Sequence, residues 1–264
     1  MTGDNNSTRR RFRSNGISRA WTIPVSIAAF LLLWVGISRW TQLPSFMLPT
    51  PTAVWLRFVR TWLDGSLLHH AGVTLGEVLS GLFLGMAVAT VLGYILAKSP
   101  LLERMLEPYI VASQAIPTVA IAPLLIIWFG PGKLSKVLIS ALIVFFPILI
   151  NTILGIRSVS EDLYDLMKSL KATPLQVLRT LELPAALPVV LGGLKIGATL
   201  SVIGAVVGEF IGSDEGLGFL INIGRGLYDT PLVFVAVFTL VFLALALYGS
   251  VLIIERTVLT WRTE

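Results

Sequence analysis

The chain has 264 residues, of which 55% are hydrophobic and 13% are charged. Soluble domains carry about 25% charged residues, so this composition favours a membrane protein over a water-soluble globule. The absence of cysteine excludes disulfides, thiolate zinc sites and cysteine nucleophiles, and only two histidines, His69 and His70, are available for a metal or acid–base centre.

Six stretches with few charges are long enough to cross a bilayer, because about 20 apolar residues span its ~30 Å hydrocarbon core. The sequence therefore predicts an all-α membrane protein with spans at 21–38, 76–97, 108–129, 137–156, 188–211 and 231–254. These spans form a permease domain over 21–254, preceded by a basic tail, 1–20, and followed by a short tail, 255–264.

The positive charges orient the chain. With the N-terminus inside, 14 of the 20 lysines and arginines fall on cytoplasmic segments, which predicts that both termini are cytoplasmic. This distribution accounts for the net charge of +5, so we expect membrane lipid and no nucleic acid around the chain. After the first span, a proline-punctuated segment leads into 53–63, whose aromatic residues favour an interfacial helix on the outer side.

Polar and proline residues interrupt the third and fourth spans. Proline frees a backbone carbonyl, and at membrane depth such breaks occur only where protein or a watery cavity satisfies the freed group. Gln114, Pro117 and Asn151 are therefore candidates for lining a translocation path. An interhelical hydrogen bond explains Gln114 and Asn151 equally well.

Glycine pairs at four-residue spacing predict closely packed helices without naming the partner helix. The pairs are Gly81/Gly85, Gly193/Gly197, Gly204/Gly208 and Gly212/Gly216. Glu209 is a further path candidate because it is an ionisable residue within the fifth span, although near its outer end. We expect the glycine-rich segment 213–230 to be a dipping or surface loop.

The longest cytoplasmic connection, 158–187, has the pattern of two short helices. In the first, an apolar stripe recurs at helical spacing, with Ser158 or Ser160 available as N-cap, acidic residues at the start and lysines at the end. The stripe consists of Leu163, Leu166, Met167 and Leu170. The second helix is expected from Pro174 through Leu181, ending where 183–188 re-enters the membrane. This compact unit is either an ordinary loop or a docking element for a soluble partner.

Nucleotide and catalytic motifs are missing. Residues 130–134 come nearest to a phosphate loop, but Ile127 stands where a glycine is needed and Leu134 where Ser or Thr is needed. We expect no catalytic residue, no metal and no cofactor in this chain. A gradient-driven transporter or channel would require paired intramembrane charges and inverted repeats. The sequence indicates only Lys195 and Glu209 within the spans, at opposite ends, and no repeat.

Residues 165–173, followed by 183–188, resemble the "EAA" coupling loop of binding-protein-dependent ABC importer permeases. Asp165, Leu166 and Met167 stand where that motif has Glu-Ala-Ala, and Leu183-Pro184 matches its Leu-Pro. Lys171 stands at the usual glycine, which permits a left-handed turn. A lysine there either accepts strain or forms a different turn.

The resemblance extends over nearly the whole chain. Residues 43–51, 113–124 and 128–130 look like the nitrate/sulfonate/taurine branch of the family. Within that branch, 168–173 and 203–210 look closest to permeases for riboflavin and for the pyrimidine precursor of thiamine.

What the resemblance implies is the permease subunit of an ATP-driven importer, with the type I ABC importer fold, in the bacterial inner membrane. It implies a permease homodimer, two cytoplasmic ABC ATPase subunits and an extracytoplasmic solute-binding protein. The implied cargo is a vitamin-type heterocycle, with an aliphatic sulfonate, taurine or nitrate as the alternative. The implied ATPase-coupling residues are Asp165, Leu166, Met167, Leu170, Lys171, Ala172, Leu183 and Pro184.

Overall fold

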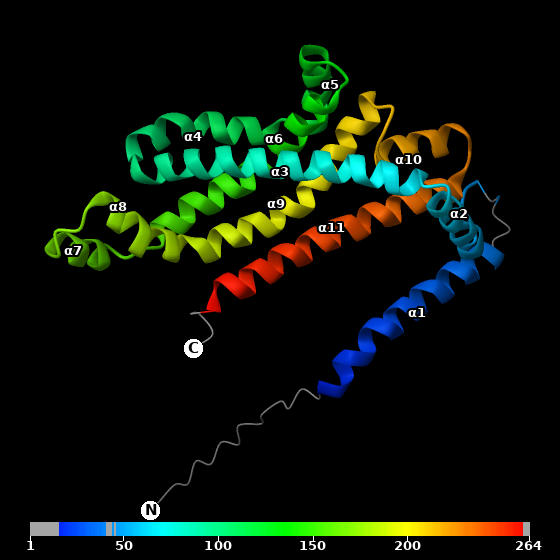
Figure 1. Ribbon diagram of the computed structural model, residues 1–264, viewed down its shortest axis with the longest axis horizontal. Helices are drawn as coiled ribbons and strands as arrows, with labels where there is room; N and C mark the ends of the chain where they lie inside the picture. The colour runs from blue at the N-terminus through cyan, green and yellow to red at the C-terminus, as the bar shows by residue number, and fades with distance from the viewer. Residues whose placement is uncertain (1–15, 41–43, 45, 261–264) are drawn as a thin grey trace, which may run out of the picture.

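The computed structural model describes residues 16–40, 44 and 46–260, which form helices and no strand (Figure 1). The expected tails therefore lie outside the described residues up to residue 15 and from residue 261. The helices are α1 (Gly16–Trp40), α2 (Pro51–Leu63), α3 (Ser66–Lys98), α4 (Pro100–Ala115), α5 (Thr118–Phe129), α6 (Lys133–Arg157), α7 (Glu161–Ser169), α8 (Pro174–Val177), α9 (Leu183–Gly212), α10 (Leu217–Gly226) and α11 (Thr230–Val258). A π-helical turn, η1 (Leu178–Glu182), joins α8 to α9.

Four helices of the described part are long and apolar enough to cross a membrane: α3, α6, α11 and the continuous helix Pro174–Gly212. The bent pair α4 and α5 makes a fifth span if it is counted as one. The apolar stretch Pro24–Ser38 of α1 is shorter than these helices. The structure thus supports four or five of the six expected spans, and the span at 21–38 stays a prediction.

The span expected over 108–129 is not one straight helix. It begins earlier, at Pro100, and is bent by 95° between α4 and α5, so that α5 turns away from the direction of α4 (Figure 1). Ile116 has extended backbone angles, φ −83° and ψ 118°, because the ring of Pro117 disfavours helical geometry in the residue before it.

Helix α6 packs closely against both α3 and α9 through the expected glycines. A Cβ added to Gly81 or to Gly204 would lie 2.5 Å from an atom of Ser140, which is too close for any real side chain. Gly85 meets the carbonyl oxygen of Ala141, and Gly193 meets the side chain of Asn151. The close packing predicted for these pairs is confirmed, and the partner helix is α6.

The pair Gly212/Gly216 behaves differently. Helix α9 ends at Gly212, and Gly216 lies in the following turn with φ +108°, so this pair packs no helix against another. The loop expected over 213–230 is also wrong in part, because it contains α10. Leu217 and Leu220 of α10 are buried, so its glycines serve close packing rather than an open loop.

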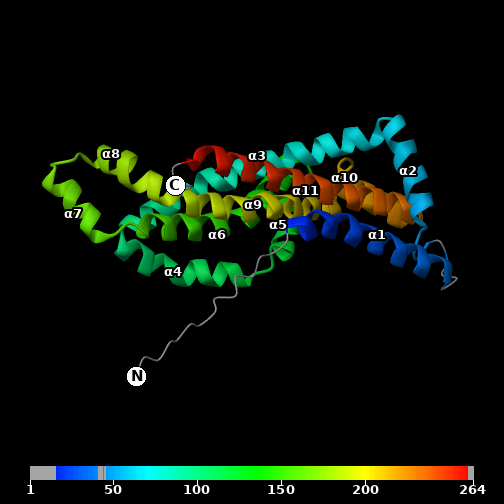
Figure 2. The same cartoon turned by 90° about the horizontal axis from the view of Figure 1, so that it is seen from below.

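Helices α2 and α10 lie together at one end of the molecule, and α7 and α8 extend from the opposite end (Figures 1 and 2). The helix expected over 53–63 is confirmed as α2, which begins with Pro51 and is capped by the Thr50 hydroxyl. The Trp34 indole donates a hydrogen bond to the Pro49 carbonyl at 3.0 Å and stacks on Phe234. These contacts attach α1 to the α2–α11 end.

Candidate functional site

The segment after α6 projects from the helix bundle (Figure 1). It exposes apolar side chains. On α7, Leu163 is 44% exposed and Leu166 is 54% exposed, while Met167 is half-buried; Leu170, the C-cap residue of α7, is 68% exposed. These side chains form the expected stripe, which no other described element covers. Such an apolar patch on an otherwise polar helix is typical of a docking surface for another protein.

The polar residues of α7 follow the expected pattern. Glu161 and Asp162 lie in the first turn. Asp165, which is also exposed, accepts a 2.8 Å contact from the Lys168 ammonium, and this hydrogen bond raises the pKa of Lys168. Ser160 occupies the N-cap position without a capping hydrogen bond.

Lys171 adopts the left-handed conformation, with φ +52°. The Ala172 N–H donates to the Met167 carbonyl at 3.0 Å, and the Lys171 N–H donates to the Lys168 carbonyl at 2.9 Å. This pair of bonds is the Schellman motif, in which glycine usually occupies the left-handed position. The structure therefore decides between the two alternatives: Lys171 accepts the backbone strain and keeps the turn.

The second short helix is not a separate element. Thr173 and Gln176 form a capping box at the start of α8, and the helix then continues through η1 into α9 without a break. The Leu183 N–H donates to the carbonyl of Leu178, five residues earlier. The helix end expected at 183–188 is therefore wrong, because this π turn precedes Pro184 and the helix runs on.

A buried carboxylate lies where η1 meets α9. Glu182 is 1% exposed and forms an ion pair with the Lys98 ammonium at the end of α3. Its carboxylate also accepts hydrogen bonds from the Tyr94 hydroxyl at 3.0 Å and the Tyr164 hydroxyl at 3.2 Å. Burial and the neighbouring Glu182 raise the pKa of the Tyr164 phenol, so it stays protonated and donates at neutral pH. We call these four side chains the Glu182 cluster.

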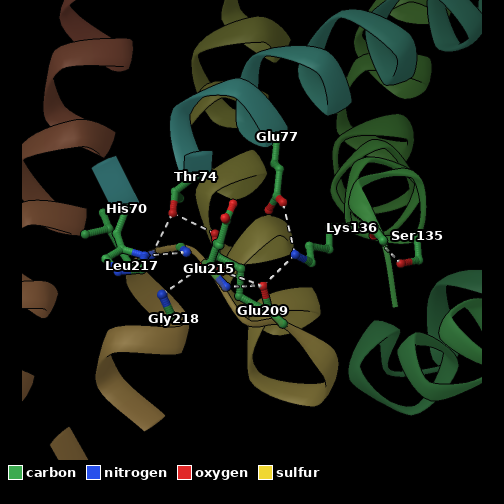
Figure 3. A network of polar contacts seen from close by, with 12 residues as sticks. His70, Thr74, Glu77, Ser135, Lys136, Glu209, Glu215, Leu217 and Gly218 are labelled. Carbon is green, nitrogen blue, oxygen red and sulfur yellow. Dashed lines mark hydrogen bonds and ion pairs between the residues drawn. The ribbon is translucent and has the colours of Figure 1, made fainter. Parts of the chain in front are cut away.

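A second buried polar cluster lies at the opposite end, near α10 (Figure 3). Glu77 and Lys136 point toward one another, with 3.3 Å between carboxylate and ammonium, and both are buried. Glu209 is 0% exposed and accepts hydrogen bonds from the Thr74 hydroxyl at 2.6 Å and the Gly218 N–H at 2.5 Å. The cluster therefore ties the α9–α10 turn to α3.

Sequence reasoning missed Glu77 and Lys136 as buried groups, because it used charged residues to mark the ends of spans. Helix α3 begins at Ser66, well before Glu77. The available signal was spacing: Glu77, Gly81 and Gly85 recur every four residues, so they share the helix face that packs on α6. The sequence analysis also did not pair Lys195 with Glu255, whose ammonium and carboxylate groups are 2.8 Å apart in the structure.

The four path candidates lie in three different surroundings. Gln114 and Pro117 are exposed at the bend between α4 and α5, where the Gln114 amide donates to the Ile110 carbonyl at 3.4 Å. Asn151 is half-buried against α9 and donates to the Pro147 carbonyl at 2.7 Å. Glu209 belongs to the buried cluster near α10. The structure of the single chain therefore does not bring the four together.

Comparison with known proteins agrees with these features. The family described as binding-protein-dependent transport system inner membrane component matches residues 81–260. A riboflavin transport system permease protein of Chloroflexus aurantiacus is 46% identical over 242 residues, covering 92% of this chain and 90% of the relative. A formylaminopyrimidine transport permease protein of Halalkalibacterium halodurans is 34% identical, covering 89% and 93%.

A relative at lower sequence identity and a solved structure also resemble this chain. A taurine transport system permease protein of Escherichia coli is 28% identical and covers 94% of this chain and 92% of the relative. A structure of the MetNI methionine ABC transporter in an inward-facing conformation superposes with a TM-score of 0.64 at 19% identity, covering 74% of this chain and 97% of the other. This superposition shows a shared fold.

The family match over residues 81–260 includes α7, the π turn and the Glu182 cluster, and the relatives are aligned over most of their own length. The resemblance noted from the coupling-loop motif is thereby confirmed, as is the branch of riboflavin, thiamine-precursor, sulfonate and taurine permeases. The chain belongs to the binding-protein-dependent transport system inner membrane components, the permease subunits of ABC importers.

Proposed function

We propose that α7 is the element through which a cytoplasmic ABC ATPase drives this permease. The observation that carries the proposal is the exposed stripe of Leu163, Leu166 and Leu170 on a helix outside the bundle. Around it, the coupling surface comprises Asp165, Met167, Lys171 and Ala172, while Leu183 and Pro184 follow the π turn at the start of α9. In this arrangement the termini and the α7 end face the cytoplasm of a bacterium, across its inner membrane.

The working unit of this proposal is a permease homodimer with two ATPase subunits and an extracytoplasmic binding protein. The family match supports the two kinds of partner. Closure of the ATPase pair on ATP moves the two α7 helices, opens the permease outward, and hydrolysis resets it. Because coupling between two sites is reciprocal in binding free energy, the loaded binding protein outside favours the ATP-bound state of the ATPase pair inside.

The Leu166→Glu variant tests the docking surface. Burying a leucine side chain contributes about 2 kcal/mol, so placing a carboxylate there weakens ATPase binding by at least about 30-fold. Leu227, which is 72% exposed in the turn after α10, provides a matched control, since Leu227→Glu carries the same chemical change at the opposite end. We expect the ATPase to co-purify with the control and not with Leu166→Glu; co-purification with both would refute the assignment.

We propose a vitamin-type heterocycle as the cargo, with riboflavin first. The 46% identity to a riboflavin permease supports this choice. An aliphatic sulfonate, taurine or nitrate is the alternative, supported by the taurine relative and by a putative aliphatic sulfonates permease of Bacillus subtilis at 32% identity. Uptake by the whole importer in vesicles, with radiolabelled riboflavin, formylaminopyrimidine and taurine offered in parallel, separates the two classes.

The translocation path is proposed to pass the exposed bend between α4 and α5. Gln114 and Pro117 present polar and backbone groups there, and proline breaks at membrane depth require such groups to face protein or water. Asn151, which is half-buried on α6, is the next candidate. Glu209 acts on the path only through the α9–α10 turn that its carboxylate holds.

A further inference from the structure

The Glu182 cluster joins three helical segments that are far apart in the chain. Lys98 and Tyr94 come from the end of α3, Tyr164 from α7, and Glu182 from the π turn. The ion pair connects residues 84 positions apart. Both carboxylate oxygens are used, one by Lys98 and Tyr164 and the other by Tyr94. A buried carboxylate is tolerated only when donors compensate its lost hydration, so these three donors hold one another in a fixed arrangement.

Tyr164 is the connection from α7 to this cluster. Among the α7 side chains, all of which the structure describes, it alone makes a hydrogen bond to another element; those of Lys168 and Ser169 end on Asp165, within α7. The Tyr164 ring also receives the Lys98 ammonium at 4.9 Å from its centroid. Apart from its two chain connections, α7 is thus linked by its side-chain hydrogen bonds to the bundle at one point.

The cluster lies at an irregular turn of the long helix. Glu182 is the last residue of η1, and π turns interrupt the regular hydrogen bonding of a helix and recur at functional positions. Pro184 follows two residues later and has no N–H to donate. A displacement of Tyr164 therefore acts on the end of α3 and on the start of α9, where the regular hydrogen bonding of the helix is interrupted.

We propose that Glu182 is a positioning residue that transmits movement of α7 to α3 and α9, with Tyr164 as the contact that α7 moves. This inference rests on the proposed docking of an ATPase on α7 and assigns the step that follows docking. In the Glu182 cluster, Lys98 and Tyr94 bind the carboxylate from α3, and Tyr164 alone binds it from α7.

The two tyrosines provide a matched pair of variants. Tyr164→Phe and Tyr94→Phe each remove one hydroxyl that donates to the same carboxylate, and each keeps the aromatic ring. A purely structural role for Glu182 predicts similar consequences for both. The transmission role predicts that only Tyr164→Phe removes the hydrogen bond between α7 and the carboxylate, whereas Tyr94→Phe leaves that bond and the Lys98 ion pair in place.

The test uses the complete importer, reconstituted in vesicles with its ATPase and binding protein, and measures solute transported per ATP hydrolysed. We expect both variants to retain the ATPase. Tyr164→Phe should lower the transport-to-hydrolysis ratio by at least about 5-fold, the lower end of coupling effects between sites, and lose stimulation by the loaded binding protein. Tyr94→Phe should keep a wild-type ratio.

Three results would overturn the proposal: equal ratios in the two variants, an unchanged ratio in Tyr164→Phe, or loss of the ATPase from that variant. Failure of the docking proposal shows itself elsewhere, as retained ATPase in Leu166→Glu. The variant Glu182→Gln provides a second measurement, because it keeps the side-chain size but weakens the Lys98 ion pair and both tyrosine hydrogen bonds. It should uncouple the importer at least as strongly as Tyr164→Phe.

Discussion

The contact between Gly204 of α9 and Ser140 of α6 allows a quantitative prediction. A Cβ on Gly204 would lie 2.5 Å from the Ser140 Cα and 3.1 Å from its nitrogen, whereas ordinary contact begins at 3.4 Å. Because the nearest atoms are backbone atoms, no side-chain rotation relieves the clash. In Gly204→Ala the two helices must therefore separate locally by about 0.9 Å, an overpacking that typically costs about 1–3 kcal/mol.

The same separation strains a buried hydrogen bond. The Ser140 hydroxyl donates to the Ser201 carbonyl at 3.0 Å, one turn away on α9, and its loss adds about 1 kcal/mol. After subtraction of the ~1 kcal/mol by which alanine favours the helix, we expect Gly204→Ala to lower the free energy of unfolding by about 1–3 kcal/mol. For a chain of this size, that corresponds to a melting temperature lower by roughly 3–10 °C.

Gly192→Ala is the matched control on the same helix, because a Cβ there meets nothing within 4 Å. Alanine favours a helix over glycine by about 1 kcal/mol, so this variant should melt at the wild-type temperature or above it. Thermal unfolding of the purified protein in detergent, followed by tryptophan fluorescence, measures both variants. Wild-type melting of Gly204→Ala would refute the close crossing of α6 and α9.

Three further changes test other parts of the structure. Lys136→Met leaves the Glu77 carboxylate buried and unpaired, so it should cost about 3–5 kcal/mol, and adding Glu77→Gln should restore most of that loss in a double-mutant cycle of thermal unfolding. Lys171→Gly removes about 1–2 kcal/mol of left-handed backbone strain, but glycine costs about 0.5–1 kcal/mol of extra conformational entropy on folding. A small net gain in the free energy of unfolding is therefore expected, whereas Lys171→Ala should show none. Gln114→Leu should change the KM or rate of uptake without altering co-purification of the ATPase, and unchanged kinetics would show that Gln114 only packs.

The sequence pattern predicted the helices and the exposed stripe well, because both depend on local spacing. Glycines every four residues predicted close packing, although not that α6 is the partner helix, and leucines at helical spacing predicted the face of α7. The error over 213–230 came from treating glycine as a loop signal. In α10, Gly218 and Gly224 instead allow close approach to Glu209 and Asp229.

The helix breaks were harder to predict, because proline acts through its surroundings. Pro117 ends α4 and produces a 95° bend, whereas Pro184 and Pro188 lie in a helix that continues. Unlike Pro117, Pro184 follows a π turn, and no local sequence pattern predicted that turn. Likewise, only the backbone angles showed that Lys171 keeps the left-handed turn that glycine usually makes.

The membrane class, most of the spans and the amphipathic helix α7 were determined by the sequence alone, because apolar length and helical periodicity are properties of a continuous segment. The positions of the charges were decided by the tertiary structure. A charged residue ends a span when it meets water, but it lies inside the bundle when a partner from a distant helix compensates its burial. Glu182 pairs with Lys98, which is 84 residues away in the chain, and Glu209 accepts a hydrogen bond from Thr74, which is 135 residues away. Such contacts exist only once the helices have packed.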